Sequence, residues 1–284
     1  MKNFLIIISI SILSFQAFSQ NNGPYVIYNS KGKKVSYKKM IRQLAKQDMV
    51  FFGELHNNPI SHWLQYEVTA ELGKERDLVL GAEMIESDNQ DELNDYLAGN
   101  IDQKGLDTLA RLWTNHKTDY KPLVDYAKEN DLTFVASNIP RRFASIVNQN
   151  GFEELTRLTN EERGWIARLP FPFDPELPRY QNILDMMAGH GTVNLVKAQA
   201  SKDATMAHFI LENWEEEKLF IHYNGAYHTG FHEGIVWYIN EYKPGLEILT
   251  ISTVEQADIT KLAEEYKGEA DFIICVDSNM TKTY

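Results

Sequence analysis

Short apolar segments that alternate with helical patterns are the feature of this sequence that most restricts its fold. The apolar segments are rich in β-branched and aromatic residues, and stretches of helical period lie between them. This alternation is typical of βαβ units, so it predicts an α/β fold with a mostly parallel central sheet flanked by helices. The predicted strands are residues 25–28 and 34–37, which form a hairpin, and residues 49–53, 78–81, 133–136, 219–222, 246–251 and 272–276.

Helical patterns fill most of the segments between these strands. The clearest begins at Asn58 and Pro59, a cap residue followed by a proline in the first turn, and carries an apolar stripe at a spacing of four. The predicted helices are residues 37–45, 59–72, 91–98, 106–113, 122–130, 141–147, 234–240 and 257–266.

Residues 151–216 interrupt this alternation. Thr159 and Glu162 have the spacing of a capping box, four prolines fill residues 170–178, and residues 180–188 and 201–214 have helical patterns. We therefore expect an all-helical insertion within a single domain that spans residues 20–284. A lid is useful only over a binding site, so we expect the insertion to cover the carboxyl ends of the strands.

The first residues have the pattern of a secretory signal peptide. A lysine precedes an apolar stretch over residues 4–15, and small residues at positions 17 and 19 precede a predicted cleavage after Ser19. The apolar stretch is shorter than the roughly 20 residues that span a bilayer, and no later segment is long and apolar enough. We expect an exported protein, periplasmic or associated with the cell surface, and not anchored through an N-terminal lipidated cysteine.

Charge and cysteine content exclude further classes. The chain has 28 Lys and Arg against 40 Asp and Glu, a net charge of −12, so its surface repels phosphate backbones and no nucleic-acid partner is expected. Cys275 is the only cysteine, which rules out an intramolecular disulfide. It lies within an apolar segment, which predicts a buried thiol.

Polar side chains follow four of the predicted strands at the point where each strand ends. In an open parallel sheet, ligands bind beyond the carboxyl ends of the strands. We therefore expect the side chains that follow neighbouring strands to converge on one crevice. They are Glu54 and His56 after the strand 49–53, Glu83 after 78–81, Asn138, Arg141 and Arg142 after 133–136, and His228 after 219–222.

This set of residues is compatible with two kinds of chemistry. His56, Glu83 and His228 could hold a divalent transition metal, and Glu54 could then act as the general base that activates a metal-bound water. Without a metal, the same groups could supply a general base and an electrostatic clamp. Whether the chain is an enzyme stays open at this point. The candidates for orienting a ligand carbonyl or carboxylate are Asn138, Arg141 and Arg142.

Two Gly-x-x-His motifs, at residues 53–56 and 225–228 with Glu83 between them, resemble those of the Tiki/TraB superfamily. The sequence also resembles the ChaN branch of this superfamily, the haem-binding iron-uptake proteins. The matching stretches are residues 52–59, 81–84, 136–141 and 198–207, and the likeness extends over about residues 45–255.

The resemblance implies an α/β domain with a helical subdomain, a role in haem or iron uptake, and haem as the cofactor. It also implies relatives that are metal-dependent hydrolases, so a divalent metal and a protease or esterase activity are the alternative. The chain departs from the branch in two places. It lacks the lipid-accepting cysteine of typical members, and its second motif reads Tyr-Asn-Gly-Ala-Tyr-His rather than Gly-Asn-Gly-His.

A haem requires a flat apolar slot, an axial ligand such as His or Tyr, and cations for its propionates. Residues 165–214 offer aromatic, methionine and histidine side chains among four cations, Arg168, Arg179, Lys197 and Lys202. The alternative is that these side chains pack the core of the helical segment itself. The expected partner is haem or another small molecule, and a homodimer stays open. The further candidates for the crevice or for a haem are His62, Tyr180, His190, His208 and Tyr227; we place His116 at the surface and His222 in the core.

Overall fold

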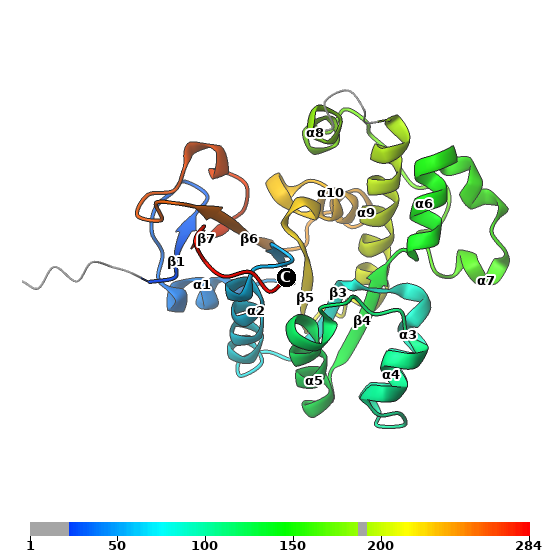
Figure 1. Cartoon of the computed structure of the whole chain (residues 1–284), viewed down its shortest axis with the longest axis horizontal. Coiled ribbons are helices and arrows are strands. Elements are labelled where there is room, and N and C mark those ends of the chain that lie inside the picture. Colours follow the sequence, from blue (N-terminus) through cyan, green and yellow to red (C-terminus); the bar gives the residue numbers. More distant parts are fainter. Residues whose placement is uncertain (1–22, 187–191) are drawn as a thin grey trace, which may run out of the picture.

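A seven-stranded sheet forms the centre of the computed structural model, which describes residues 23–186 and 192–284 (Figure 1). The strand order is β1-β7-β6-β2-β5-β3-β4, and every neighbouring pair is parallel except β1 with β7. This confirms the predicted α/β class. The strands are β1 (Tyr25–Asn29), β2 (Met49–Glu54), β3 (Leu78–Glu86), β4 (Thr133–Asn138), β5 (Leu219–Gly225), β6 (Ile248–Gln256) and β7 (Phe272–Asp277).

Helices cover both faces of the sheet (Figure 1). Successive side chains of a strand point to opposite faces, so Val50 and Phe52 join the core beneath α1, α2 and α5, whereas Met49 and Phe51 join the core beneath α9 and α10. The helices are α1 (Tyr37–Leu44), α2 (Pro59–Leu72), α3 (Gln90–Leu97), α4 (Gln103–Leu109), α5 (Lys121–Glu129), α6 (Arg141–Asn150), α7 (Asn160–Arg163), α8 (Pro178–Met186), α9 (Val193–Asn213) and α10 (Ile235–Tyr242).

The start of α2 is fixed beside the end of β2 by its cap. The Asn58 side chain accepts hydrogen bonds from the amides of Ile60 and Ser61, at 3.0 and 3.1 Å. The Asn58 amide group in turn donates to Glu255 Oε1 at 2.6 Å. Because Glu255 lies near the end of β6, this cap holds the loop after β2 against a neighbouring strand end.

The segment 151–216 is helical in much of its described part, as expected, but it is not only a lid. Its long helix α9 packs on the sheet, where Ala204, Ala207 and Ile210 share a buried cluster with Phe51 and Phe220. This helix lies in the connection from β4 to β5 and covers this face of the sheet. Parts of the segment also reach the strand ends, where the Arg179 carbonyl in α8 accepts from Tyr227 and Asp203 in α9 contacts His228.

Two predicted elements are wrong. Residues 34–37 form no strand, and a single antiparallel bridge links Tyr28 to Lys34. Residues 257–266 form no α-helix, because local side chains bind the backbone instead: Asp258 Oδ1 accepts from the Thr260 amide at 2.9 Å, and Gln256 Oε1 accepts from the Ala263 amide at 3.0 Å. Such bonds compete with helical ones.

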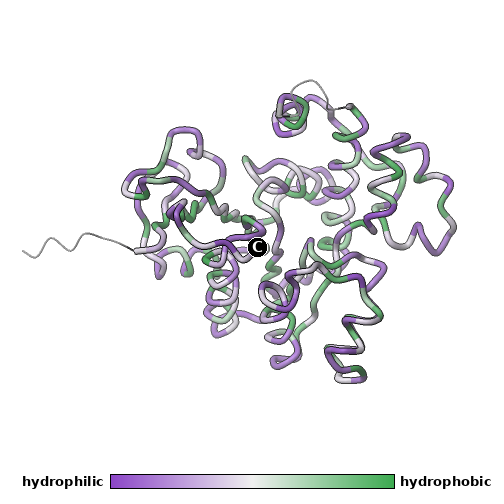
Figure 2. Tube along the Cα trace, in the orientation of Figure 1, coloured by the Kyte–Doolittle hydropathy of each residue, from purple (hydrophilic) through white to green (hydrophobic). Residues whose placement is uncertain are grey.

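Cys275 is fully buried, as predicted. None of the described helices is long and apolar enough to cross a membrane. Hydrophilic residues predominate in the outlying loops near α4 and α7 (Figure 2). The predicted signal peptide, residues 1–19, lies outside the described residues.

Candidate functional site

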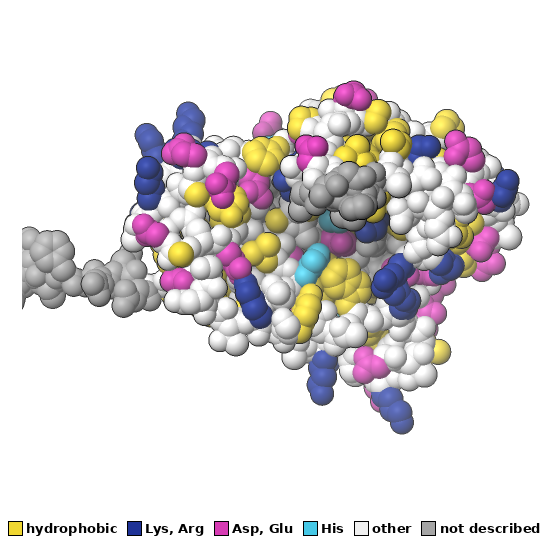
Figure 3. Space-filling view, turned by 45° about the horizontal axis from the view of Figure 1, so that its top comes forward, with side chains coloured by type: hydrophobic (Ala, Val, Ile, Leu, Met, Phe, Trp, Pro, Cys, Tyr) yellow, Lys and Arg dark blue, Asp and Glu magenta, His cyan; other side chains and the backbone are white. Residues whose placement is uncertain are grey.

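The strand order brings four of the predicted site segments to one edge of the sheet. β2, β5, β3 and β4 are consecutive neighbours and parallel, so their carboxyl ends meet at the same edge. Figure 3 shows histidine and hydrophobic side chains together on a hollowed face, with lysine or arginine side chains beside them.

Glu54, the last residue of β2, is fully buried and has a partner on each side. Its Oε1 lies 2.8 Å from His56 Nδ1 and accepts from the Tyr120 hydroxyl at 2.8 Å. Its Oε2 accepts from Gln65 at 2.6 Å and lies 3.4 Å from His62 Nδ1. Burial raises the pKa of Glu54, but hydrogen bonds from His56 and His62 outweigh it and lower that pKa. Glu54 is therefore a charged anchor for the histidines.

His56 is the half-exposed imidazole of this cluster, with 35% of its side chain accessible. Its ring meets the edge of Trp113, with 4.9 Å between centroids, and its carbonyl faces His62 Nε2 at 3.0 Å. A Cβ on Gly225 would lie 2.8 Å from His56 Nε2, so only glycine permits this close approach. Burial lowers the pKa of His56. The hydrogen bond to Glu54 and the charges of Glu54 and Glu83 raise that pKa by a larger amount, so the net shift is upward.

The second cluster is centred on His228, which is buried between two carboxylates. His228 Nε2 lies 3.2 Å from Glu83 Oε1, and its Nδ1 lies 2.5 Å from Asp203 Oδ1. The Tyr180 hydroxyl donates to Asp203 Oδ2 at 2.9 Å, and the Gly225 amide donates to Glu83 Oε2 at 2.7 Å. Burial opposes the charge on His228, but Glu83 and Asp203 raise its pKa to about 9. His228 is therefore an imidazolium at neutral pH.

The two clusters meet at Gly225, as the predicted convergence requires. A Cβ built there would lie 2.8 Å from His56 Nε2 and 3.5 Å from Glu83 Oε2. The predicted metal site requires at least three ligating side chains around one point. Within residues 23–186 and 192–284, no group of three or more His, Cys, Asp or Glu side chains is placed to hold a metal ion. In particular, both nitrogens of His228 already face carboxylates.

A cavity of about 610 Å³ opens beside these clusters. One part of its wall is apolar, formed by Leu112, Trp113 and Ile139, and another part carries the cations Arg141 and Lys202. The cavity is also lined by His56, Glu83, Glu86, Arg111, Thr114, Asn115, Asn138, Ala144, His228 and Tyr284.

Two polar groups on the cavity wall differ in their pairing. Asn138 Oδ1 is buried and has no hydrogen-bond partner in the described part of the chain. Arg111, in contrast, pairs with Glu86. Burial raises the pKa of Glu86 despite this partner.

A second cavity of about 600 Å³ lies beside the first, and both are lined by His56 and Tyr284. Tyr227 lines only the second, where its hydroxyl donates to the Arg179 carbonyl at 2.5 Å. The Arg179 guanidinium lies 3.8 Å from the centroid of the Tyr227 ring. Tyr227 thus stands at the rim of the same strand-end region.

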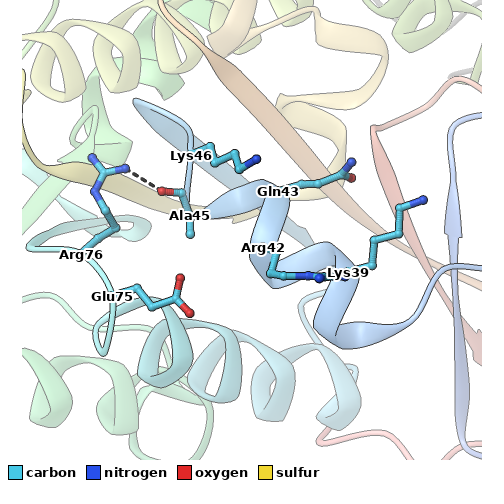
Figure 4. A pocket seen from close by; sticks show the side chains of 7 residues that line it. All are labelled: Lys39, Arg42, Gln43, Ala45, Lys46, Glu75 and Arg76. Carbon is cyan, nitrogen blue, oxygen red and sulfur yellow. Dashed lines mark hydrogen bonds between the residues drawn. The ribbon is translucent and has the colours of Figure 1, made fainter.

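A further hollow, of about 580 Å³, lies away from this edge and is predominantly basic (Figure 4). Arg76 within it donates to the Ala45 carbonyl at 2.7 Å. Lys46 and Arg76 precede β2 and β3, so this hollow lies near the amino ends of the strands. Its lining is Lys39, Arg42, Gln43, Ala45, Lys46, Glu75 and Arg76.

Comparison with protein families decides where this chain belongs. The model of the family described as "Haem-binding uptake, Tiki superfamily, ChaN" matches residues 40–239, which include all the residues of the two clusters. The chain belongs to this family.

Solved structures show the same fold for this ChaN-family chain. One is ChaN of Campylobacter jejuni, whose structure describes cofacial haem binding; it is 18% identical, the match covers 89% of this chain and 97% of that one, and the TM-score is 0.67. Another is a Bacillus cereus protein, 12% identical, with 84% and 90% covered and a TM-score of 0.51. No curated protein matches the chain.

Some predicted residues of this ChaN-family chain lie away from the crevice. Arg142 pairs with Asp88 and is not among the residues that line the cavity, and its role in orienting a ligand stays a prediction. His208 lies 3.5 Å from Glu212 and lines a separate cavity of about 310 Å³. His190 falls outside the described residues.

The aromatic side chains of the helical segment form its own core rather than an open slot. Phe152 meets Phe171 and Phe173 at centroid distances of 5.0 and 5.1 Å. Phe173 in turn lies 6.2 Å from the buried Tyr180. The structure therefore favours the packing alternative over a haem slot within this segment.

Two further histidines, His222 and His116, are both buried. His222 is in the core as predicted, 2.8 Å from Ser137 Oγ and 3.1 Å from Asn224 Oδ1. His116, predicted at the surface, is buried, and neither ring nitrogen has a partner in the described part of the chain. Burial lowers the pKa of His116 to about 4, so it is neutral.

Several residues of the site are not among those predicted from the sequence. Asp203 on α9 could have been found, because it lies within the matched stretch 198–207 and is acidic amid small residues. Gln65 and Tyr120, which bind Glu54, and Trp113, which packs on His56, gave no signal. Gln65 lies well inside α2, past the strand end, and Trp113 and Tyr120 lie between α4 and α5, which no strand end precedes.

Proposed function

We propose that this chain binds haem in the strand-end crevice and acts in haem or iron uptake as an exported protein. The observation that carries the proposal is the make-up of the 610 Å³ cavity, which is lined by a half-exposed imidazole, by apolar side chains and by the cations Arg141 and Lys202. Membership of a haem-binding uptake family supports the same conclusion.

His56 is the residue that we assign to the haem iron. Histidines that ligate a metal commonly donate their other ring N–H to a carboxylate, which orients the ring and raises its basicity. His56 Nδ1 has this partner in Glu54 at 2.8 Å, and Glu54 is itself held by Gln65 and Tyr120. Bound haem would supply an iron with an axial position for an imidazole.

The rest of the cavity wall fits the other parts of a haem. Leu112, Trp113 and Ile139 offer apolar surface to a porphyrin, whose burial from water would provide most of the affinity. Arg141 and Lys202 line the same cavity and would pair with propionates. A volume of about 610 Å³ lies within the ordinary range for sites that bind small molecules.

The export part of the proposal depends on residues 1–19. Their charged start, apolar middle and small residues before the predicted cut support a signal peptide. Expression in a secreting host, followed by N-terminal sequencing of the exported protein, should find Gln20 as the first residue. An intact Met1 on protein retained in the cytoplasm would contradict export.

Haem titration of two matched variants tests the binding site. His56→Asn removes a half-exposed histidine that contacts a carboxylate. His232→Asn removes another, since His232 is 41% accessible and lies 3.0 Å from Asp271. Asparagine tolerates the left-handed backbone of His232. We expect His56→Asn to shift the Soret band and weaken affinity about 10- to 100-fold, and His232→Asn to match the parent.

The same preparation distinguishes the alternative that the sequence left open. A parent that gives no Soret band under saturating haem, but carries stoichiometric Zn, Mn or Co by elemental analysis, would refute the proposal. It would favour a metal-dependent hydrolase instead.

A further inference from the structure

We propose that Tyr284 forms a wall of the haem crevice and packs its ring on the bound haem, held there by the segment 278–284, which we call the strap. The proposal rests on the proposed function, because it assigns a further contact to the same ligand. It concerns a residue that lies outside both Gly-x-x-His motifs and far along the chain from them.

The strap is tied across the strand-end edge at several points. The Thr283 amide donates to the Asn57 carbonyl at 3.0 Å, in the loop that follows β2. Lys282 pairs with Glu255, near the end of β6. Glu255 also accepts from Asn58, the cap of α2, at 2.6 Å. These contacts fix the strap beside His56 rather than along the outside of the sheet (Figure 1).

Tyr284 reaches the space that the haem would occupy. His56 and Tyr284 are the two residues that line both adjoining cavities, so a flat ligand bound by His56 has the Tyr284 ring beside it. Burial, together with the carboxylates of Glu54 and Asp119, raises the pKa of Tyr284, which agrees with a phenol directed toward the site.

Tyr284 is open to solvent beside the cavity that it lines. The residue is 67% exposed, the highest value among the exposed large hydrophobic residues of the described chain. An aromatic ring offers a large contact area and loses little conformational entropy when it packs. The strap holds such a ring at the mouth of a cavity, where a porphyrin would cover it.

The test is the rate at which haem leaves the full chain, measured by transfer to an excess of apomyoglobin. Tyr284→Ala should release haem roughly tenfold faster, because a buried aromatic contact is lost. Tyr284→Phe should stay close to the parent, since the ring remains. Lys282→Ala, which removes the ion pair between the strap and Glu255, should also accelerate release.

Matched controls separate this effect from general damage. Tyr242→Ala removes another exposed tyrosine, which lines the cavity near His208. Lys267→Ala removes a surface lysine that pairs with Glu264 at 2.6 Å. Both should release haem at the parental rate.

Two results would overturn the proposal while leaving haem binding itself intact. One is a parent that binds haem and a Tyr284→Ala variant that releases it no faster. The other is a Tyr284→Phe variant as fast as Tyr284→Ala, which would replace ring packing with a role for the hydroxyl. A parent that binds no haem would refute the proposed function instead.

Discussion

Gly225 is the residue at which the two clusters depend on each other. Its backbone needs no left-handed conformation, so the cost of adding a methyl group is purely steric. In Gly225→Ala the new Cβ would lie 2.8 Å from His56 Nε2, and the imidazole would have to move. We expect the variant to lose about 1–3 kcal/mol of stability and about tenfold in haem affinity.

Urea unfolding and haem titration check this, with Gly23→Ala as the control. The nearest atom to a Cβ on Gly23 is 3.6 Å away, an ordinary contact, so that variant should match the parent in both measurements. An unchanged haem affinity in Gly225→Ala would mean that His56 does not take part in binding.

His228 predicts how stability depends on pH. Its pKa is raised from 6.5 to about 9, because Glu83 and Asp203 outweigh the effect of burial. The stabilisation is therefore complete below pH 6.5 and is lost as the pH rises through about 9. We expect the free energy of unfolding of the parent to fall over this window by up to about 3 kcal/mol.

His228→Gln isolates that contribution. The variant should be less stable at pH 6.5, and its free energy of unfolding should change much less between pH 6.5 and 9 than that of the parent. Parallel curves for the two proteins, measured by urea unfolding across this range, would show that His228 is not held as an imidazolium.

At the scale of elements, the cap of α2 links local structure to the site. Asn58→Ala removes the bonds to the Ile60 and Ser61 amides and the one to Glu255. We expect a loss of about 1–2 kcal/mol of stability, the usual effect of removing an N-cap. Because Glu255 also holds the strap through Lys282, haem release should become faster as well.

Ser36→Ala is the matched variant for this prediction. Ser36 caps α1 by accepting from the Lys39 amide at 3.3 Å, away from the strand-end edge. It should also destabilise the chain but leave haem release unchanged. Equal effects of the two variants on haem release would show that the cap of α2 acts only through global stability.

Much of the element pattern could be predicted because period and caps are local properties. Buried strands such as β2 and β3, and the start of α2 at Asn58 and Pro59, were visible in the sequence. The segment 257–266 was not, because side-chain bonds from Gln256 and Asp258 to the backbone replace its helix. The length of α9 could not be predicted either, because it depends on packing against the sheet and not on a local sequence pattern.

At the scale of the whole molecule, the sequence predicts the site residues at strand ends but not those that only tertiary packing brings to the site. Glu54, His56, Glu83 and His228 lie at or just beyond the carboxyl ends of β2, β3 and β5, and these neighbouring parallel strands bring such positions together. Tertiary packing alone directs other side chains toward them, as with the Trp113 ring on His56. Likewise, only the docking of the strap places Tyr284 beside the cavity.

The central claim is that haem binds in the strand-end crevice with its iron on His56. Crystals of the haem-loaded full chain, measured at the iron absorption edge, would locate the iron directly. We predict an anomalous peak at bonding distance from His56 Nε2, with the porphyrin between Trp113 and the cations Arg141 and Lys202. An iron peak among α8 and α9, or ligated by a residue outside the crevice, would contradict the account.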